Sequence, residues 1–492
     1  MKYRWSWVAL WALCASVMVR AEKGPVDLLE ADFAGAESLR QNTNLVTLQE
    51  VMGLTESAAM ADTILQRSGT LGLSAWTGFG PSDFSLTLRE ALEHRCRLLV
   101  TGPTHAPVFA LAVRFSSDLP SAWKAGGAVY TNELTQASQK GSWVIVQSKT
   151  GGTNLSAWID RITADTNDAS AILTLSANLD VWPSGLKPGL MPNLSGLQLT
   201  STVRGDGVRS AATLRFATNL NLRLTPWNIP TNSIHDPLVA FSAAQDPAAW
   251  LNGSELLSRF ALSKPPGQAY LWSVSLSPFM FNGAVSSADP KAQMDVTAHA
   301  LADRYNAGIE KRLFGQLEYD TNQNRMSWLG LPIAMPHLMV APDPGYLTFG
   351  LFPVSGKLKP APAELFEQVI GRTNLVYYDW EITQGRMQQL RTVTQLRSII
   401  ARGGLHTTNA VSERWLEAIE PRLGNAVGEL TLSRTNEMSL VRRSPIGLDA
   451  MELVGLARWA EPFPSGPKHT RRAPPSLPPV TPLPPAEVKS PQ

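Results

Sequence analysis

Several segments of the chain alternate apolar and polar residues with a period of two, which is the pattern of a half-buried β-strand. Six such segments occur in pairs joined by short polar turns, and each pair predicts an antiparallel hairpin. The three predicted hairpins cover residues 197–216, 316–328 and 428–442. Connections this short favour an antiparallel sheet over a doubly wound parallel one.

Other segments carry apolar residues three and four positions apart, the spacing of a helix with one buried face. Helices are predicted over residues 300–314, 387–400, 411–423 and 449–460, with Asp449 as the N-cap of the last. Strands and helices of this kind together predict an α+β fold.

An apolar strand followed by Ala-Trp occurs three times, with the Trp at positions 123, 158 and 250. In each case we expect a helix whose first turn buries the Trp against the sheet. This recurrence predicts two related halves, each an antiparallel-rich sheet packed by helices. Three prolines within residues 225–237 interrupt any regular element. We therefore predict an N-terminal α+β domain over residues 22–230 and a C-terminal α+β domain over residues 231–461.

The start of the chain has the features of an export signal. Lys2 and Arg4 precede an apolar run over residues 5–19, and Val19-Arg20-Ala21 places small residues at the positions that a signal peptidase reads. Residues 1–21 are therefore predicted to be a signal peptide. The alternative is an uncleaved N-terminal anchor, although the run is shorter than the ~20 residues that a bilayer span needs.

The end of the chain, residues 462–492, contains 11 prolines. Proline fixes the backbone φ angle and lacks an N–H, so this segment favours extended polyproline II and is predicted to be a disordered, Pro-rich tail. Three roles for this tail remain open: a ligand for a partner, a stiff spacer that reaches toward an anionic cell-envelope polymer, and a solvated end without a partner.

Composition narrows the functional classes. The 43 Lys and Arg residues nearly balance the 41 Asp and Glu residues, which argues against nucleic-acid binding. Without residues 1–21, Cys96 is the only cysteine, so no intramolecular disulfide is expected. No segment after the signal peptide is apolar over the length of a membrane span. We expect an extracytoplasmic protein, either periplasmic or secreted.

Motifs of common reactive sites are missing from the sequence. The 7 histidines are scattered, and none lies in the HExxH context of a metal site. The chain has no GxSxG elbow, no GxxxxGK[ST] phosphate loop and no GxGxxG after a strand. We accordingly predict no metal ion and no cofactor.

The strongest candidate for chemistry is the predicted strand over residues 374–383. Period-two alternation places Asp379 and Glu381 on one face and Val376, Tyr378, Trp380 and Ile382 on the other. Side chains two strand residues apart lie ~6–7 Å from each other, close enough for two carboxyls to act as an acid/base pair. The alternative is an ordinary sheet strand whose polar face meets an Arg or solvent.

Asp379-Trp380-Glu381 resembles the catalytic strand of family-18 chitinases. The resemblance implies that Glu381 would be the general acid and that Asp379 would orient an acetamido group of the substrate. Only about 80 residues follow before the tail, however, too few for the four further βα units of a barrel. We judge this local resemblance to be coincidental.

The body of the chain, from about Leu71 to Glu461, resembles a group of uncharacterised exported bacterial proteins built around domains of unknown function. Residues 238–244, residues 374–383 and the strand–Ala-Trp units carry this resemblance. It implies export but no catalytic or binding residues.

The sequence leaves three functions open. We expect a non-enzymatic binding or structural component of the cell envelope, whose partner is an unknown envelope protein or polymer. The alternative is a glycan-active hydrolase that uses Glu381 and Asp379. A carrier of a hydrophobic ligand would need a large apolar cavity between sheet and helices. Oligomeric state does not follow from the sequence.

Overall fold

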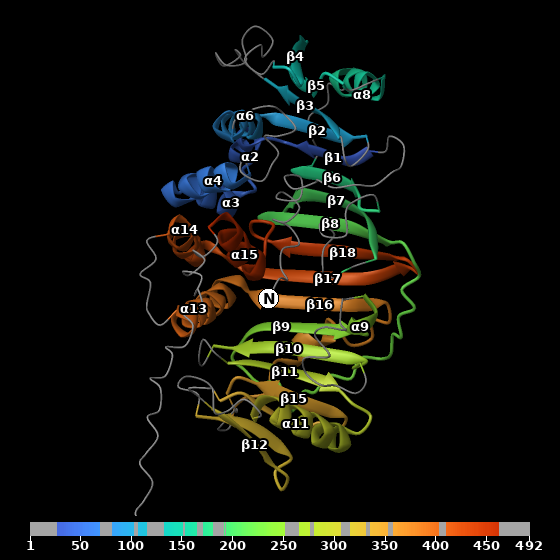
Figure 1. The fold of residues 1–492 in the computed structure, drawn as a ribbon, viewed down its shortest axis with the longest axis vertical. Coiled ribbons are helices and arrows are strands. Elements are labelled where there is room, and N and C mark those ends of the chain that lie inside the picture. The colour runs from blue at the N-terminus through green and yellow to red at the C-terminus, as the bar shows by residue number, and fades with distance from the viewer. Residues whose placement is uncertain are drawn as a thin grey trace, which may run out of the picture.

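The described part of the chain forms one antiparallel sheet of 18 strands, stacked along the long axis of the molecule (Figure 1). The computed structural model describes residues 27–68, 81–102, 107–115, 132–150, 153–164, 171–180, 191, 193–250, 265–275, 280–306, 315–330, 335–352, 358–402 and 410–461. In spatial order the strands are β4 (Thr135–Lys140), β5 (Trp143–Ser148), β3 (Val108–Arg114), β2 (Arg95–Thr101), β1 (Asp27–Phe33), β6 (Leu173–Asn178), β7 (Leu194–Arg204), β8 (Gly207–Phe216), β18 (Glu437–Ser444), β17 (Asn425–Arg434), β16 (Leu375–Ile382), β9 (Leu238–Gln245), β10 (Gln268–Val274), β11 (Phe281–Ser286), β15 (Tyr346–Gly350), β14 (His337–Val340), β13 (Arg325–Leu329) and β12 (Gln316–Asp320).

The last three strands of the chain lie in the middle of this sheet. In Figure 1, β16, β17 and β18 (orange to red) separate β8 from β9 (green). β8 pairs with β18 in unbroken register, from Val208 opposite Ser444 to Arg215 opposite Glu437. The domain boundary predicted at residue 230 falls between β8 and β9, and the sheet continues across this point through the three C-terminal strands.

The order of strand pairing repeats along the chain. Among the first eight strands, β1 lies between β2 and β6, β3 between β2 and β5, and β7 between β6 and β8. From β9 onward, β9 lies between β10 and β16, β11 between β10 and β15, and β17 between β16 and β18. The two series meet where β8 pairs with β18.

Helices cover the two faces of the sheet unequally. We call the face that carries Asp379 and Glu381 the helix face, and the opposite face, which carries Tyr378 and Trp380, the groove face. The described helices are α2 (Ala36–Gln41), α3 (Val46–Met52), α4 (Thr55–Ser68), α6 (Pro81–Glu93), α8 (Thr153–Ala164), α9 (Pro247–Trp250), α11 (Pro290–Asn306), α12 (Ala363–Glu367), α13 (Thr383–Arg402), α14 (Val411–Ile419) and α15 (Ala450–Ala460), together with the 3₁₀ turn η5 (Glu420–Arg422).

The middle of the helix face is covered by α13, α14 and α15, which share one buried apolar cluster with α3 and α4. On the groove face, α8 packs near one end of the sheet, where the indole N–H of Trp158 donates to Glu30 of β1 at 3.0 Å. Farther along the same face, α12 packs Phe366 against Phe241 of β9, with ring centroids 5.6 Å apart. The strands between these two helices carry no described helix on the groove face.

Most of the predicted elements are present. The three hairpins form β7–β8, β12–β13 and β17–β18, and the α+β prediction is confirmed at that level. The Ala-Trp pattern buries Trp158 in α8 and Trp250 in α9, although Trp158 lies in the second turn of its helix and not in the first. Trp123 lies outside the described residues. The predicted signal peptide and the predicted tail also lie outside them.

The largest error in a predicted helix boundary is at the start of α11. The helix expected from residue 300 begins at Pro290, because the Asp289 carboxylate accepts the backbone N–H of Ala292 at 3.0 Å and proline is well tolerated in a first helical turn. Residues 307–314 of that prediction lie outside the described residues.

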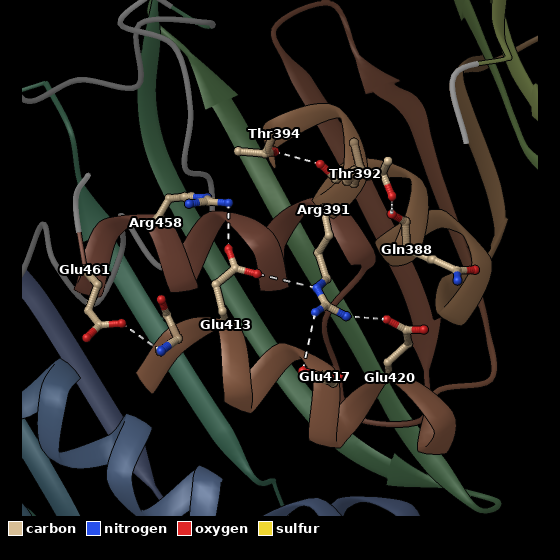
Figure 2. Close-up of polar contacts among 11 residues, drawn as sticks. Gln388, Arg391, Thr392, Thr394, Glu413, Glu417, Glu420, Arg458 and Glu461 are labelled. Atoms are coloured by element: carbon tan, nitrogen blue, oxygen red, sulfur yellow. Dashed lines mark hydrogen bonds and ion pairs between the residues drawn. The ribbon is translucent and has the colours of Figure 1, made fainter. Parts of the chain in front are cut away.

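Ion pairs join the three helices over the middle of the sheet (Figure 2). The Glu413 carboxylate of α14 lies 2.8 Å from Arg458 of α15 and 3.6 Å from Arg391 of α13. Arg391 also lies 2.7 Å from Glu420 of η5. The Glu413 side chain is only 8% exposed, so this contact depends on mutual neutralisation of charges removed from water.

We predict that Glu413→Gln lowers the free energy of unfolding by roughly 2–4 kcal/mol, because it leaves Arg458 and Arg391 less compensated in a desolvated site. Glu417→Gln is the matched control: Glu417 lies on the same helix, is 76% exposed and is 3.9 Å from Arg391. That variant should change stability by less than about 0.5 kcal/mol. Urea unfolding of both variants measures the difference, and equal losses would contradict the stabilising role of Glu413 in the helix layer.

Candidate functional site

The candidate site is built on β16, whose sequence LVYYDWEI is rich in aromatic and β-branched residues. Its alternation is the predicted one: Asp379 and Glu381 point to the helix face, whereas Tyr378 and Trp380 point to the groove face. Val376 was predicted on the face of Tyr378. It packs instead in the cluster of Leu430 and Met438 on the helix face, because a bulge between Leu375 and Tyr377 shifts the register.

Glu381 is enclosed by α15. Glu381 is 4% exposed, and its carboxylate accepts a hydrogen bond from the backbone N–H of Ala450 at 2.8 Å. Ala450 is the first residue of α15, where backbone N–H groups lack helical partners and the helix dipole favours a negative charge. Glu381 therefore fixes the start of α15 on the sheet.

The same helix end is capped from within. Asp449 accepts the N–H of Glu452 at 2.8 Å, and Glu452 accepts the N–H of Asp449 at 3.1 Å, which is a reciprocal capping box. Asp449 was predicted as the N-cap, and this prediction is confirmed. The carboxylates of Asp449 and Glu452 both pair with Arg442 of β18, the first at 3.1 Å. Arg442 thus ties the start of α15 to the centre of the sheet.

Asp379 completes this group of acids. Its carboxylate accepts a hydrogen bond from the Ser242 hydroxyl of β9 at 2.5 Å. We call Asp379, Glu381, Asp449 and Glu452 the carboxylate cluster. Three of these carboxyls, Asp379, Asp449 and Glu452, interact with the charge of Arg442, and Arg386 of α13 is a further positive charge near Asp379.

Charge crowding and burial perturb the cluster. Burial raises the pKa of Glu381 to about 8, and the negative charges of Asp449 and Asp379 add to the effect. Burial and Asp449 likewise raise the pKa of Glu452 to about 8 and raise the pKa of Asp379. A carboxylic acid that stays protonated near neutral pH could act chemically as a general acid. In this fold, however, that proton lies beneath a helix.

The opposite face of β16 lines an open groove of about 490 Å³. The side chains of Tyr378 and Trp380 form its aromatic floor, and α12 forms one wall. The lining residues are Asp236, Leu238, Pro362, Glu364, Leu365, Gln368, Tyr378, Trp380, Val427, Glu429, Val441 and Arg443.

The groove combines aromatic and charged groups. Glu429 forms an ion pair with Arg372 at 3.0 Å, with both side chains about one-third exposed. Tyr378 is 3% exposed, and burial raises its pKa to about 12, with the nearby charge of Glu429 adding to the shift. At neutral pH its phenol is therefore protonated, and its buried ring supports the floor of the groove from below.

The sequence indicated the strand but not the groove. The alternation in the sequence placed Tyr378 and Trp380 on the strand face opposite the two acids, but it did not indicate that they line a groove. The period-two pattern of Val427, Glu429, Val441 and Arg443 in the third hairpin was available as a signal. The sequence did not indicate which strand this hairpin would join, because β16 and β17 are separated along the chain by α13 and α14.

Neither metal ligation nor a membrane span is indicated in the described ranges. No group of three or more His, Cys, Asp and Glu side chains there is arranged to hold a metal ion. None of the helices described combines the length and apolarity needed to cross a bilayer.

No family model, curated protein or solved structure matches this chain. Function must therefore be argued from the site itself.

We predict that Glu381→Gln changes the pH dependence of stability. Glu381 ionises near 4.5 in an unfolded chain and near 8 in the fold, so its contribution is present below pH 4.5 and lost as pH rises toward 8. The glutamine amide oxygen can still accept the Ala450 N–H, without the charge. Relative to wild type, the variant should therefore gain stability between pH 5 and 8, by at most about 1.4 kcal/mol per pH unit.

Urea unfolding at several pH values measures this difference, and subtraction of the wild-type curve removes the titration of the other acids. Glu318→Gln on the exposed surface of β12 is the control and should leave the curve unchanged. A variant that loses stability relative to wild type as pH rises would contradict the raised pKa.

Proposed function

We propose that the chain is an exported, extracytoplasmic, non-enzymatic binding component of the cell envelope, and that its ligand is an envelope polymer held in the groove. One observation carries the proposal. Asp379 and Glu381, the acids best placed in the sequence for chemistry, are built into the contact between the sheet and α15, on the face opposite the groove. The export features at residues 1–21 support the location.

The lining of the groove supports binding. Aromatic rings provide flat apolar area with little conformational entropy to lose, while a few charged groups orient a ligand. Beyond the groove, toward α8, the groove face continues as a polar surface that could extend the contact with a polymer. This surface includes Ser176, Gln198, Thr200, Thr213 and Ser439, which register aligns across β6, β7, β8 and β18.

A glycan hydrolase is the second candidate function. The raised pKa of Glu381 favours it, since a general acid must hold its proton at the working pH. A sugar would then have to reach a carboxyl that is enclosed beneath α15 and already accepts a helix N–H. Binding in the groove requires no such opening.

We also infer that the two halves of the chain are related by duplication. The repeated order of strand pairing supports this, with β1–β3 and β5–β8 matching β9–β11 and β15–β18. In each series a helix on the groove face, α8 or α12, precedes the strand that returns beside the first one. In this proposal the β8–β18 pairing is the join between the copies.

Two neighbouring residues of β16 test the proposed function. Trp380→Ala removes the aromatic floor of the groove, and Glu381→Gln alters the opposite face. In co-sedimentation with purified peptidoglycan sacculi, Trp380→Ala should reduce the bound fraction roughly tenfold, because stacking of a sugar ring on an aromatic face is worth about 1.4 kcal/mol. Glu381→Gln should bind as wild type does.

The hydrolase alternative predicts another pattern: wild type would release soluble sugars from sacculi, and Glu381→Gln would abolish that release. Binding that survives Trp380→Ala would overturn the groove as the site. Circular dichroism and the melting temperature establish that each variant is folded.

Cell fractionation, with recovery of partners for the full chain and for a chain lacking residues 462–492, tests the location and the role of the tail.

A further inference from the structure

Two arginines face each other at the centre of the sheet. Arg209 of β8 and Arg443 of β18 are direct partners in the antiparallel register. Both point to the groove face, because the residues before them, Val208 and Arg442, are placed on the helix face. Directly opposed residues on neighbouring strands have Cβ atoms about 5 Å apart, so two positive charges share one small area.

In the described part of the chain, the charges of Arg209 and Arg443 are not neutralised by a carboxylate, whereas that of Arg215 on the same strand pair is. Arg215 and Glu437, at the other end of the same strand pair, are also direct partners and form an ion pair at 3.4 Å. Within the part of the chain that the structure describes, no carboxylate lies within ion-pair distance of Arg209 or Arg443. The Arg209 Nε atom is buried and has no hydrogen-bond partner there. Opposed like charges are unfavourable, and an anion between them would offset the repulsion.

The arginine pair lies at one end of the groove. Arg443 itself lines the groove, and register places Trp380, Val427, Arg443 and Arg209 in one row across β16, β17, β18 and β8. Strands are about 4.8 Å apart, so Trp380 and Arg443 are separated by roughly 10 Å, which is the length of about two sugar rings.

Resting on the proposed function, we propose that the groove selects a carboxylate-bearing glycan. The carboxylate binds between Arg209 and Arg443, and an uncharged sugar ring lies on Trp380, which is only partly buried. Three acids also line the groove: Glu364 of α12, Asp236, which precedes β9, and Glu429, which is already paired with Arg372. A ligand with one acidic substituent per disaccharide therefore matches the charge distribution, whereas a dense polyanion would be repelled at the acidic wall.

Two disaccharides test this selectivity with the full-length protein. N-acetylglucosaminyl-N-acetylmuramic acid carries one free carboxylate, and its neutral counterpart, di-N-acetylchitobiose, lacks the lactyl group. Isothermal titration calorimetry should give wild type an affinity ratio of at least about 10 in favour of the acidic sugar, since charge-assisted hydrogen bonds are the strong ones. That ratio should fall as the salt concentration rises.

Arg209→Gln and Arg443→Gln should each bring the ratio close to 1. Arg215→Gln, on the same strand and face but neutralised by Glu437, is the matched control and should keep the wild-type ratio. A wild-type ratio near 1 with measurable binding of both sugars would overturn this inference while leaving the groove as a binding site. Binding of neither sugar also overturns it, and sedimentation with sacculi then decides separately whether the proposed function stands.

Discussion

Alternate residues of the central strand β16 point to opposite faces of the sheet, and this alternation separates the buried carboxyls from the aromatic groove. β16 turns Asp379 and Glu381 toward the helices and Tyr378 and Trp380 toward the groove. Since successive strand residues must point to opposite faces, neither set can change sides without a shift in register. β16 is held in place by β17 on one side and β9 on the other, so that register is fixed from both directions.

The carboxylate cluster explains how α15 is held against the sheet. Buried carboxyls are costly unless they are paired or hydrogen-bonded. Here Arg442 pairs with Asp449 and Glu452, and the first N–H of α15 binds Glu381. The pKa values of Glu381 and Glu452 are raised to about 8, so these carboxyls are protonated near neutral pH and the negative charge of the cluster is reduced. This protonation requires no catalytic role. Perturbed carboxyls can thus serve architecture.

The sequence predicted what depends on local pattern. Alternation in residues 374–383 indicated both faces of β16, and Asp449 before an apolar helical run indicated the cap of α15. What it could not predict depends on pairings between distant segments. Arg442 and Arg443 acquire their roles only because β18 joins β8, more than 200 residues earlier in the chain. The bulge that moves Val376 and the Ser242 partner of Asp379 arise in the same way, from neighbouring strands.

Carbodiimide labelling of carboxyl groups in the native protein, read out by mass spectrometry, tests most directly whether the acids of β16 are enclosed. Glu364 on the exposed surface of α12 serves as the internal reference. We expect Glu364 to be modified rapidly, while Asp379 and Glu381 react only when the protein unfolds. Labelling of Glu381 in the folded protein at a rate comparable to that of Glu364 would show an accessible acid, and would contradict the assignment of this side chain to the framework.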